Sequence, residues 1–450
     1  MKINSTYKVK ILHYNNIFSA SIEVYQKAVD YFIRVCLENW EYVSSFSGSK
    51  AKQGAVEKLT IPTKNNLEPA YLFPEADKRF QKFPCYLRRA AITEAIGKVS
   101  SYKSNLANWE TIDSSARGKR PGMPEAGNVY PVLYKDNMYK QSGFYEFRIK
   151  VWIRNTWDWI TVKVRKSDMD YINRHCKERK RLSPTLQKRY KNWYLDFCFE
   201  EKVDLNDTPT EDKTILAVDL GINNAGTCCV MLSDGTVVGR HFLKLSTEED
   251  SLKHAIGRIK KAQQHGARKI PRLWGKAKGI NQDIAVKTAK FIIDIAVLYS
   301  VDVIVFEALD TFGKKWGSKK QRLHHWKANA VQTMVTDKAH RIGMRISRIC
   351  AWGTSRLAYD GSGSVQRGKD AGFSSYSICR FRTGKIYNCD LSASYNIGAR
   401  YFIREFLKSL PEKVKLDVLA KVPELSKRTT CTLSSLIRMH AVLYSLGYSC

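Results

Sequence analysis

Three short segments in the second half of this chain each combine an apolar stretch with a carboxylate. The run from Ile215 to Val218 ends on Asp219, and the run from Val303 to Phe306 ends on Glu307. The third segment opens an expected helix with Asp390. Short apolar runs that alternate with helical stretches are typical of the buried strands of an α/β sheet. We therefore expect the first two carboxylates at one rim of a sheet, with Asp390 approaching from the last helix.

Carboxylates gathered in this way are suited to binding magnesium. One or two carboxylates hold Mg²⁺, and phosphate oxygens of a substrate complete its octahedral shell. Two such ions about 3.5–4 Å apart activate a water and stabilise the leaving 3′ oxygen. Each residue alone has a simpler explanation: Asp219 as a turn residue before Gly221, Glu307 as a surface charge, Asp390 as a helix N-cap. Their joint order favours catalytic, magnesium-binding Asp219, Glu307 and Asp390.

The charge of the chain indicates a polyanionic partner. Of the 450 residues, 75 are Lys or Arg and 43 are Asp or Glu, a net charge of +32 that is spread along the whole chain. An excess of this size repels itself unless an anion offsets it. Nucleic acid fits better than a membrane, because no apolar run is long enough to span a bilayer. The 11 cysteines form no CxxC pair and no signal segment is seen, so we expect a cytoplasmic protein.

The first half of the chain is expected to be helical and then β. The expected helices and strands are a strand at 7–13, helices at 19–44 and 84–109, a breaker at 117–122, and strands at 144–153, 158–164 and 194–199, with a charged interruption at 177–191.

From Thr214 the pattern is α/β. We expect strands at 215–218, 226–232, 237–242, 303–306 and 344–349, helices around 284–298, 322–341 and 391–407, a Gly/Ser-rich loop at 353–388, and a helical tail at 411–450 without a recognisable motif.

Two basic stretches are candidates for nucleic-acid contact. The segment from Leu252 to Gln282 contains no Asp or Glu, and the expected helix at 84–109 carries Arg88. A solvated positive face is the alternative explanation for both. The cationic residues of the first stretch are Lys253, Arg258, Lys260, Lys261, Arg268, Lys269, Arg272, Lys276 and Lys278.

The acidic segments resemble the split RuvC-type nuclease of the RNase H superfamily, and more closely the TnpB proteins and the compact type V CRISPR effectors. The matching stretches are Ala217-Val218-Asp219-Leu220-Gly221, Val305-Phe306-Glu307-Ala308-Leu309, Gly353-Thr354-Ser355-Arg356 and Asp390-Leu391-Ser392-Ala393-Ser394-Tyr395-Asn396-Ile397. The resemblance covers about residues 214–400, whereas the first half matches only in the order of its elements.

This resemblance implies a multidomain α+β and α/β protein: an RNase H-like (RuvC) nuclease domain with an N-terminal β-barrel wedge domain and an inserted helical recognition domain. It implies an RNA-guided DNA endonuclease, with guide RNA and double-stranded DNA as partners and a two-ion Mg²⁺ site. The basic stretch would contact the guide or the heteroduplex. The implied domains are wedge 1–14 and 127–211, recognition 15–126, nuclease 212–352 and 389–408, a degenerate target-binding loop 353–388, and a tail 409–450.

One departure from the family concerns zinc. The family places a four-cysteine zinc ribbon after the Thr-Ser-Arg segment, and here its ligand positions fall on Ala358, Gly361, Cys379 and Arg382. One ligand cannot build a tetrahedral site, so we expect no structural zinc. The loop would then be a metal-free flap. Its expected phosphate contacts are Arg367, Lys369, Arg380 and Arg382. Arg356 is expected near the scissile phosphate, with packing at the surface as the alternative explanation.

Two other functions stay open at this point. One is an RNA-guided DNA binder with little or no cleavage, and the other is a guide-independent transposase or resolvase on the same nuclease fold. The sequence also leaves open a homodimer and the origin of the guide, from a CRISPR array or from a transposon end.

Overall fold

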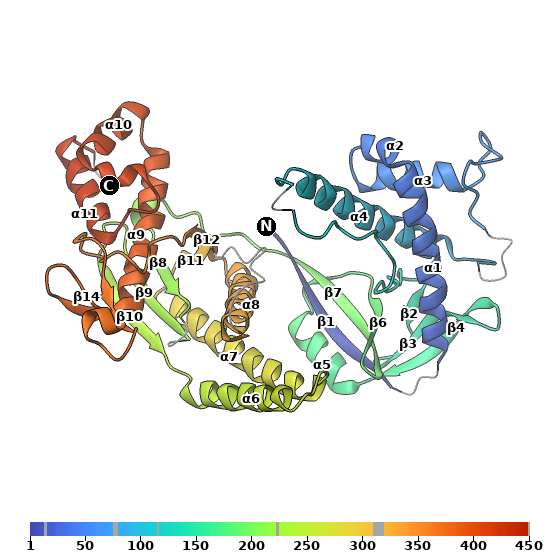
Figure 1. Ribbon diagram of the computed structural model, residues 1–450. Helices are drawn as coiled ribbons and strands as arrows, with labels where there is room; N and C mark the ends of the chain where they lie inside the picture. Colours follow the sequence, from blue (N-terminus) through green and yellow to red (C-terminus); the bar gives the residue numbers. More distant parts are fainter. Residues whose placement is uncertain (13–15, 75–79, 115–116, 222–224, 309–318, 449–450) are drawn as a thin grey trace. The chain divides into compact units, whose positions relative to one another are not determined.

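The computed structural model describes residues 1–12, 16–74, 80–114, 117–221, 225–308 and 319–448 (Figure 1). Its contacts divide the chain into two units, one of residues 2–201 and one of residues 202–450 with Met1. The expected boundary between residues 14 and 15 and the last residue of the Val305–Leu309 stretch lie outside the described residues, as do Ile222 and Asn223.

The first unit combines a seven-stranded sheet with helices. The strands lie in the order β2-β3-β4-β1-β7-β5, and β6 pairs with β7. Alternation along β3 buries Phe147 and Ile149 and turns Arg148 outward, as expected for a sheet with one covered face. The elements are β1 (Lys2–Leu12), α1 (Ile17–Glu38), α2 (Trp40–Ser45), α3 (Ser49–Thr60), α4 (Cys85–Glu110), β2 (Tyr139–Gln141), β3 (Glu146–Ile153), β4 (Thr156–Val164), α5 (Lys166–His175), β5 (Lys180–Arg181), β6 (Thr185–Arg189) and β7 (Asn192–Lys202).

Three predictions for this unit need correction. The helix expected at 19–44 is divided at Asn39, whose backbone leaves the helical conformation, into α1 and α2. The charged stretch at 177–191 does not interrupt the sheet but contains β5 and β6, because their charged side chains lie at or near the surface while the backbone pairs with β7. Helix α5 was not expected at all.

The second unit is built on a five-stranded sheet in the order β10-β9-β8-β11-β12. Strands β8, β9 and β10 are antiparallel neighbours, whereas β11 runs parallel to both β8 and β12. These strands are β8 (Ile215–Asp219), β9 (Gly226–Met231), β10 (Val237–Leu243), β11 (Val303–Ala308) and β12 (Arg345–Cys350), and a short 3-10 turn, η1 (Thr210–Asp212), precedes them.

Helices cover both faces of this sheet (Figure 1). On one face α9 (Cys389–Ser409) packs on Ile215, Ala217, Val303 and Val305. The alternate residues of β8 and β11 face the opposite side, where α7 (Pro271–Leu298) and α8 (Lys319–Arg341) complete a second core. Because neighbouring residues of a strand point to opposite faces, these two cores assign every side chain of β8 and β11 to a face.

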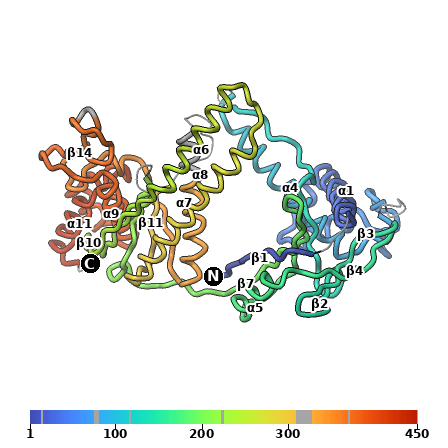
Figure 2. The backbone as a smooth tube through the Cα atoms, turned by 90° about the horizontal axis from the view of Figure 1, so that it is seen from below, coloured from blue at the N-terminus to red at the C-terminus, as the bar shows by residue number. Residues whose placement is uncertain are grey.

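Two insertions extend from this sheet. Between β10 and β11, α6 (Ser246–Gln264) runs beside the first part of α7 (Figure 2). A small apolar cluster around Ala255, Ile259 and Ala277 holds this pair together. Residues 353–388 are not merely a loop, as the sequence predicted, because they contain the three-stranded sheet β13 (Gln366–Arg367), β14 (Ile378–Arg380) and β15 (Ile386–Asn388), with a 3-10 turn η2 (Gly368–Ala371).

The C-terminal tail is part of the core of this second unit. It forms α10 (Glu412–Lys421), the 3-10 turn η3 (Pro423–Ser426) and α11 (Leu433–Ser445). Leu436, Met439 and Leu443 of α11 are buried in the same core as α9. Across the described ranges, no helix has the length and apolar character needed to cross a membrane.

Candidate active site

The register of two parallel strands brings Asp219 and Glu307 together. Val218 of β8 pairs with Phe306 of β11, so the two carboxylates follow directly after the last paired residues. Val218 and Phe306 face α7 and α8, and alternation therefore turns Asp219 and Glu307 toward the face that α9 covers. Asp390 lies in the first turn of α9, on that same face.

The negative charges of Glu307 and Asp390 both act on Asp219. The pKa of Asp219 is raised well above its usual value, first by burial and then by the negative charges of Glu307 and Asp390. A half-buried carboxylate near two other negative charges loses stability in its charged form. The structure therefore brings all three sequence-predicted acids into one electrostatic cluster.

Glu307 is held in place by the segment that follows β12. The Thr354 hydroxyl donates a hydrogen bond to Oε1 of Glu307, and Thr354 itself is buried. Burial raises the pKa of Glu307, while this hydrogen bond and the positive charge of Arg400 oppose the rise. The amide of Asn396 on α9 donates to the carbonyl oxygens of Thr354 and Leu357, each at 2.9 Å. Thr354 thus connects the position of the Glu307 carboxylate to α9.

Arg400 fixes the same segment to the C-terminal tail. Among the described residues its guanidinium donates to four backbone carbonyls and to no carboxylate. These are the carbonyls of Cys350 at 2.9 Å and Trp352 at 2.8 Å, at the end of β12 and after it, and those of Thr429 at 2.9 Å and Cys431 at 3.0 Å before α11. One buried side chain therefore connects the support of Glu307 with the tail.

The supporting roles of Asn396 and Arg400 were not predicted from the sequence, although a signal for them was present. Ser392, Asn396 and Arg400 recur every four residues along a helix whose face is otherwise apolar, and all three are buried. Polar residues on the core side of a helix need partners. Ser392 accepts a hydrogen bond from the Tyr359 amide, so the whole row holds the segment after β12.

The cations predicted to contact nucleic acid differ in their placement. Arg367 on β13 lies close enough to Asp219 to lower the pKa of that carboxyl, and its Nη2 atom is buried without a hydrogen-bond partner among the described residues. Arg356, Arg380 and Arg382 are exposed. The side chain of Lys369 lies outside the described residues.

The basic stretch lies on the paired helices α6 and α7, and all of its cations are exposed. Those on α6, on α7 and between them are Lys253, Arg258, Lys260, Lys261, Arg268, Lys269, Arg272, Lys276 and Lys278. Arg88, in contrast, is half-buried on α4 of the first unit.

The donors of the acidic cluster fit Mg²⁺ by their chemistry, since carboxylate oxygens are the ligands this ion prefers. A cation beside Asp219 would also remove the repulsion that raises its pKa. Within the described ranges, however, no group of three or more His, Cys, Asp or Glu side chains lies closely enough together to hold a metal ion by itself.

We expect the acidic cluster to make the metal-free protein less stable as pH rises. Asp219 and Glu307 have raised pKa values, so the folded state binds more protons than the unfolded state. The free energy of unfolding then falls as pH rises from about 4 through the raised pKa values of the two carboxyls, by up to about 1.4 kcal/mol per pH unit for each proton. Urea unfolding in EDTA at several pH values measures this slope.

The matched variant for this measurement is Asp219→Asn. His340 and His440 have lowered pKa values and contribute a slope of the opposite sign, so the difference between the two proteins is the informative quantity. We expect the variant to lose less stability than the wild type as pH rises, and Mg²⁺ to stabilise the wild type more. Identical pH profiles would show that the cluster does not titrate in this way.

Comparison with known proteins covers both parts of the chain. Residues 5–153 match the model of the Aq_aa04 family. The uncharacterized protein aq_aa04 of Aquifex aeolicus (strain VF5) is 30% identical over 148 residues, which are 29% of this chain and 82% of that protein. The TnpB-like protein aq_aa05 of the same organism is 26% identical over 257 residues, 52% of this chain and 82% of that protein.

The fold also matches a solved structure. In the cryo-EM structure of a Cas12f1–sgRNA–target DNA complex, one chain superposes with a TM-score of 0.53 at 13% identity, over 86% of this chain and 83% of that one. At this identity the match concerns the fold, which is accordingly multidomain with mixed α and β structure. The chain belongs to the Aq_aa04 family, and its similarity to a TnpB-like protein supports the predicted relationship to the TnpB and type V proteins.

Proposed function

We propose that this protein is an RNA-guided DNA endonuclease with an RNase H-like, RuvC-type nuclease domain. The observation that carries the proposal is the cluster of Asp219, Glu307 and Asp390 on one face of the five-stranded sheet. Further support comes from the TnpB-like relative and from the fold shared with a protein whose structure was solved with sgRNA and target DNA. The comparisons lend no support to a homodimer, so the proposal concerns the single chain.

In this proposal the domains are those implied by the family. Residues 212–352 and 389–408 form the nuclease, and residues 353–388 form a target-binding flap. The strands of the first unit form the wedge, and its helices between residues 15 and 126 form the recognition domain. The sheet order β10-β9-β8-β11-β12, with three antiparallel strands followed by two parallel ones, supports the RuvC-type assignment.

The residues of the acidic cluster have distinct parts in the proposed reaction. Asp219, Glu307 and Asp390 would hold Mg²⁺, which when bound supplies an activated water and stabilises the leaving 3′ oxygen. The hydrogen bond from the Thr354 hydroxyl restrains the Glu307 carboxylate. The buried, unpartnered Nη2 of Arg367 is available to a phosphate oxygen, and an arginine beside a phosphodiester offsets its negative charge.

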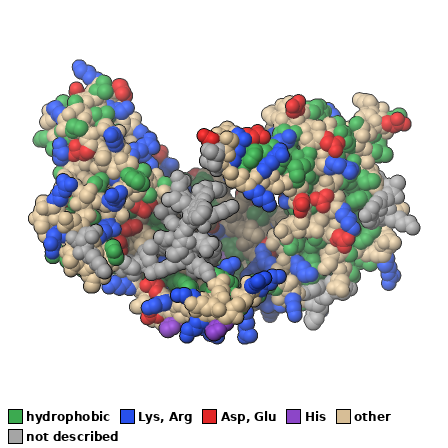
Figure 3. Space-filling model, in the orientation of Figure 1, with side chains coloured by type: hydrophobic (Ala, Val, Ile, Leu, Met, Phe, Trp, Pro, Cys, Tyr) green, Lys and Arg blue, Asp and Glu red, His purple; other side chains and the backbone are tan. Residues whose placement is uncertain are grey.

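The paired helices α6 and α7 support a polynucleotide partner. Their exposed cations form a surface on which the stretch from Leu252 to Gln282 has no acidic residue to compete with phosphates. Lys and Arg side chains are also spread over the visible face of each unit (Figure 3). Such surfaces bind the nucleic-acid backbone irrespective of sequence, with an affinity that falls as salt rises. We propose that this surface contacts the guide RNA or the guide–target heteroduplex.

The test is cleavage directed by RNA. The protein is purified with the RNA that it retains, that RNA is sequenced, and plasmids carrying the matching target beside a randomised flank are incubated with it and Mg²⁺. We expect cleavage only of plasmids that match the RNA, and loss of cleavage after RNase treatment or with EDTA. RNA from repeats or from an element end would identify the source of the guide.

Other outcomes of this assay separate the alternatives. Cleavage that survives RNase would indicate a guide-independent transposase or resolvase. Retention of matched DNA without cutting at any Mg²⁺ concentration would indicate an RNA-guided binder. A protein that retains no RNA and ignores DNA would contradict the proposal as a whole.

A further inference from the structure

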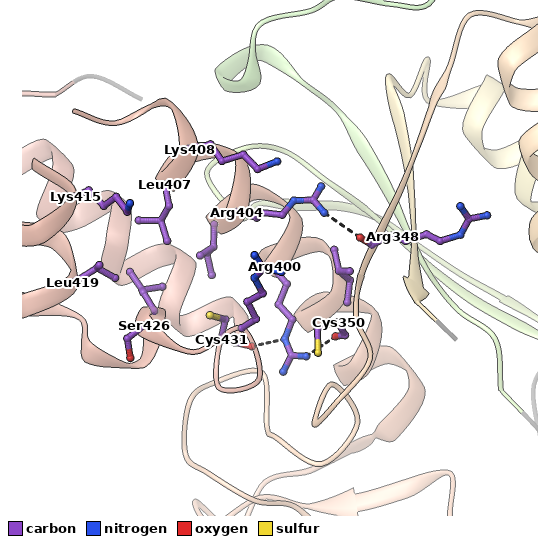
Figure 4. Close-up of a pocket in the computed structure, with 14 residues that line it drawn as sticks. Arg348, Cys350, Arg400, Arg404, Leu407, Lys408, Lys415, Leu419, Ser426 and Cys431 are labelled. Carbon is purple, nitrogen blue, oxygen red and sulfur yellow. Dashed lines mark hydrogen bonds between the residues drawn. The ribbon is translucent and has the colours of Figure 1, made fainter. Parts of the chain in front are cut away.

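A cavity on the C-terminal side of the second unit lies apart from the acidic residues of the cluster. It has a volume of about 330 Å³ and is lined by residues of β12, α9, α10 and the segment around η3 (Figure 4). Asp219, Glu307 and Asp390 are not among its lining residues. Six of its 14 lining residues come from the C-terminal tail, for which the sequence suggested no role.

The cavity is strongly cationic. Its lining includes no Asp or Glu, and the side chain of Arg348 turns away from the other lining residues (Figure 4). The remaining cationic side chains are Arg400, Arg404, Lys408, Lys415 and Arg428.

Nearby carboxylates offset only part of this charge. Glu405 accepts hydrogen bonds from both Arg404 and Lys408, and Glu412 pairs with Lys415. Among the described residues Arg400 donates hydrogen bonds to carbonyls only, but the negative charge of Glu307 also acts on it, and Arg428 forms no ion pair within the part of the chain that the structure describes. Five cations therefore stand against three carboxylates, which leaves a net positive cavity suited to an anion.

Apart from Ser426, the rest of the wall is largely apolar. Ile403 and Leu407 on one side and Leu419 and Leu425 on the other form an aliphatic surface between the cations. A simple inorganic anion would leave this aliphatic surface without a contact. A molecule with both a flat apolar group and an anionic group would contact the aliphatic surface and the cations. The volume lies at the lower end of the range for ligand pockets, which fits one small molecule rather than a peptide helix.

We propose that this cavity binds a single nucleotide, with its phosphate on the guanidinium of Arg428 and neighbouring cations and its base against Leu407 and Leu419. Arginine is the side chain best suited to phosphate, and its planar group also stacks on bases. The nucleotide is either free or an unpaired nucleotide of a bound strand, since both present the same chemistry. The proposal does not depend on cleavage by the acidic cluster.

Binding of nucleoside monophosphates to the full chain, freed of nucleic acid at high salt, tests this by calorimetry. We expect AMP or UMP to bind, and adenosine or inorganic phosphate alone to bind at least about tenfold more weakly, because each lacks half of the contacts. Arg428→Ala should weaken binding about tenfold, as expected for the loss of a hydrogen bond to a charged group.

Matched variants on α10 give the decisive comparison. Leu419→Trp fills the cavity and should abolish binding, whereas Leu416→Trp, at a position 59% exposed on the same helix, should leave it unchanged. Lys415→Ala changes a residue that lines the cavity, whereas Lys413→Ala changes one that does not. The two variants therefore compare the same loss of charge inside and outside the cavity. Thermal unfolding checks that each variant is folded.

The source of the nucleotide is then separated by crosslinking. An oligonucleotide with 4-thiouridine that crosslinks to peptides within residues 400–431 indicates an unpaired nucleotide of a strand. AMP binding without such a crosslink indicates a free nucleotide. If no monophosphate binds at millimolar concentration, or if Leu419→Trp binds it as the wild type does, the proposal is wrong, whatever the result of the cleavage assay.

Discussion

Asp219→Asn is expected to reduce the rate of Mg²⁺-dependent DNA cleavage by roughly a thousandfold or more. The substitution keeps the size of the side chain and removes the charge at the centre of the acidic cluster. Metal ions contribute several kcal/mol to transition-state stabilisation, and each 1.36 kcal/mol corresponds to about tenfold in rate. Single-turnover cleavage of a matched plasmid, with the protein loaded with its own RNA, measures the loss.

Folding and DNA binding should survive this change. Burial and two neighbouring carboxylates disfavour the charged form of Asp219, so the metal-free variant should be at least as stable as the wild type. Asp294→Asn, at an exposed position on α7, removes one carboxylate of the same unit without touching the cluster and should cut normally. Unimpaired Mg²⁺-dependent cutting by Asp219→Asn would show that the acidic cluster is not the catalytic centre.

Arg400→Met is expected to reduce the free energy of unfolding of the second unit by about 3–5 kcal/mol. Methionine fills much of the same space but leaves the carbonyls of Cys350, Trp352, Thr429 and Cys431 without their donor. A buried carbonyl that has lost its donor lowers the free energy of unfolding by the full cost of its desolvation. Urea unfolding followed by circular dichroism measures the change.

Arg404→Met is the matched control, one turn further along α9. Arg404 is more exposed, with 29% of its side chain accessible, and its ion pair with Glu405 is partly screened by water. We expect a loss of about 1 kcal/mol at this position. Equal losses for the two variants would mean that Arg400 is not the residue that holds the tail. If the tail supports Glu307, Arg400→Met should also raise the Mg²⁺ concentration needed for half-maximal cleavage.

The helices and strands around the acidic cluster were largely predictable, because each depends on local patterns. Strands β8 and β11 are short apolar runs, and α9 is a long amphipathic helix, so period and length alone identify them. The predictions of strands that failed did so because they, too, relied on local patterns. Strands β5 and β6 are charged, and their structure depends on pairing with a distant strand, which no local pattern records.

Within the candidate site, the sequence identified the three acids but not what holds them. Asp219 and Glu307 are recognisable because they end buried strands. Thr354 and Arg400 are not, because their partners are a side chain or carbonyls 29–50 residues away along the chain. Residue types alone showed that three of the four zinc-ligand positions carry no cysteine. They did not predict the three-stranded sheet that residues 353–388 contain.

By itself, the sequence determined which residues are acidic, which runs are buried and that the chain is strongly cationic, because residue type and periodicity are local properties. Only the tertiary structure decided that Val218 pairs with Phe306, that α9 covers the face toward which the acids point, and that the tail closes over the same core. The physical reason is that strand register and helix packing follow from contacts between distant segments, whose stability depends on the whole core rather than on any one segment.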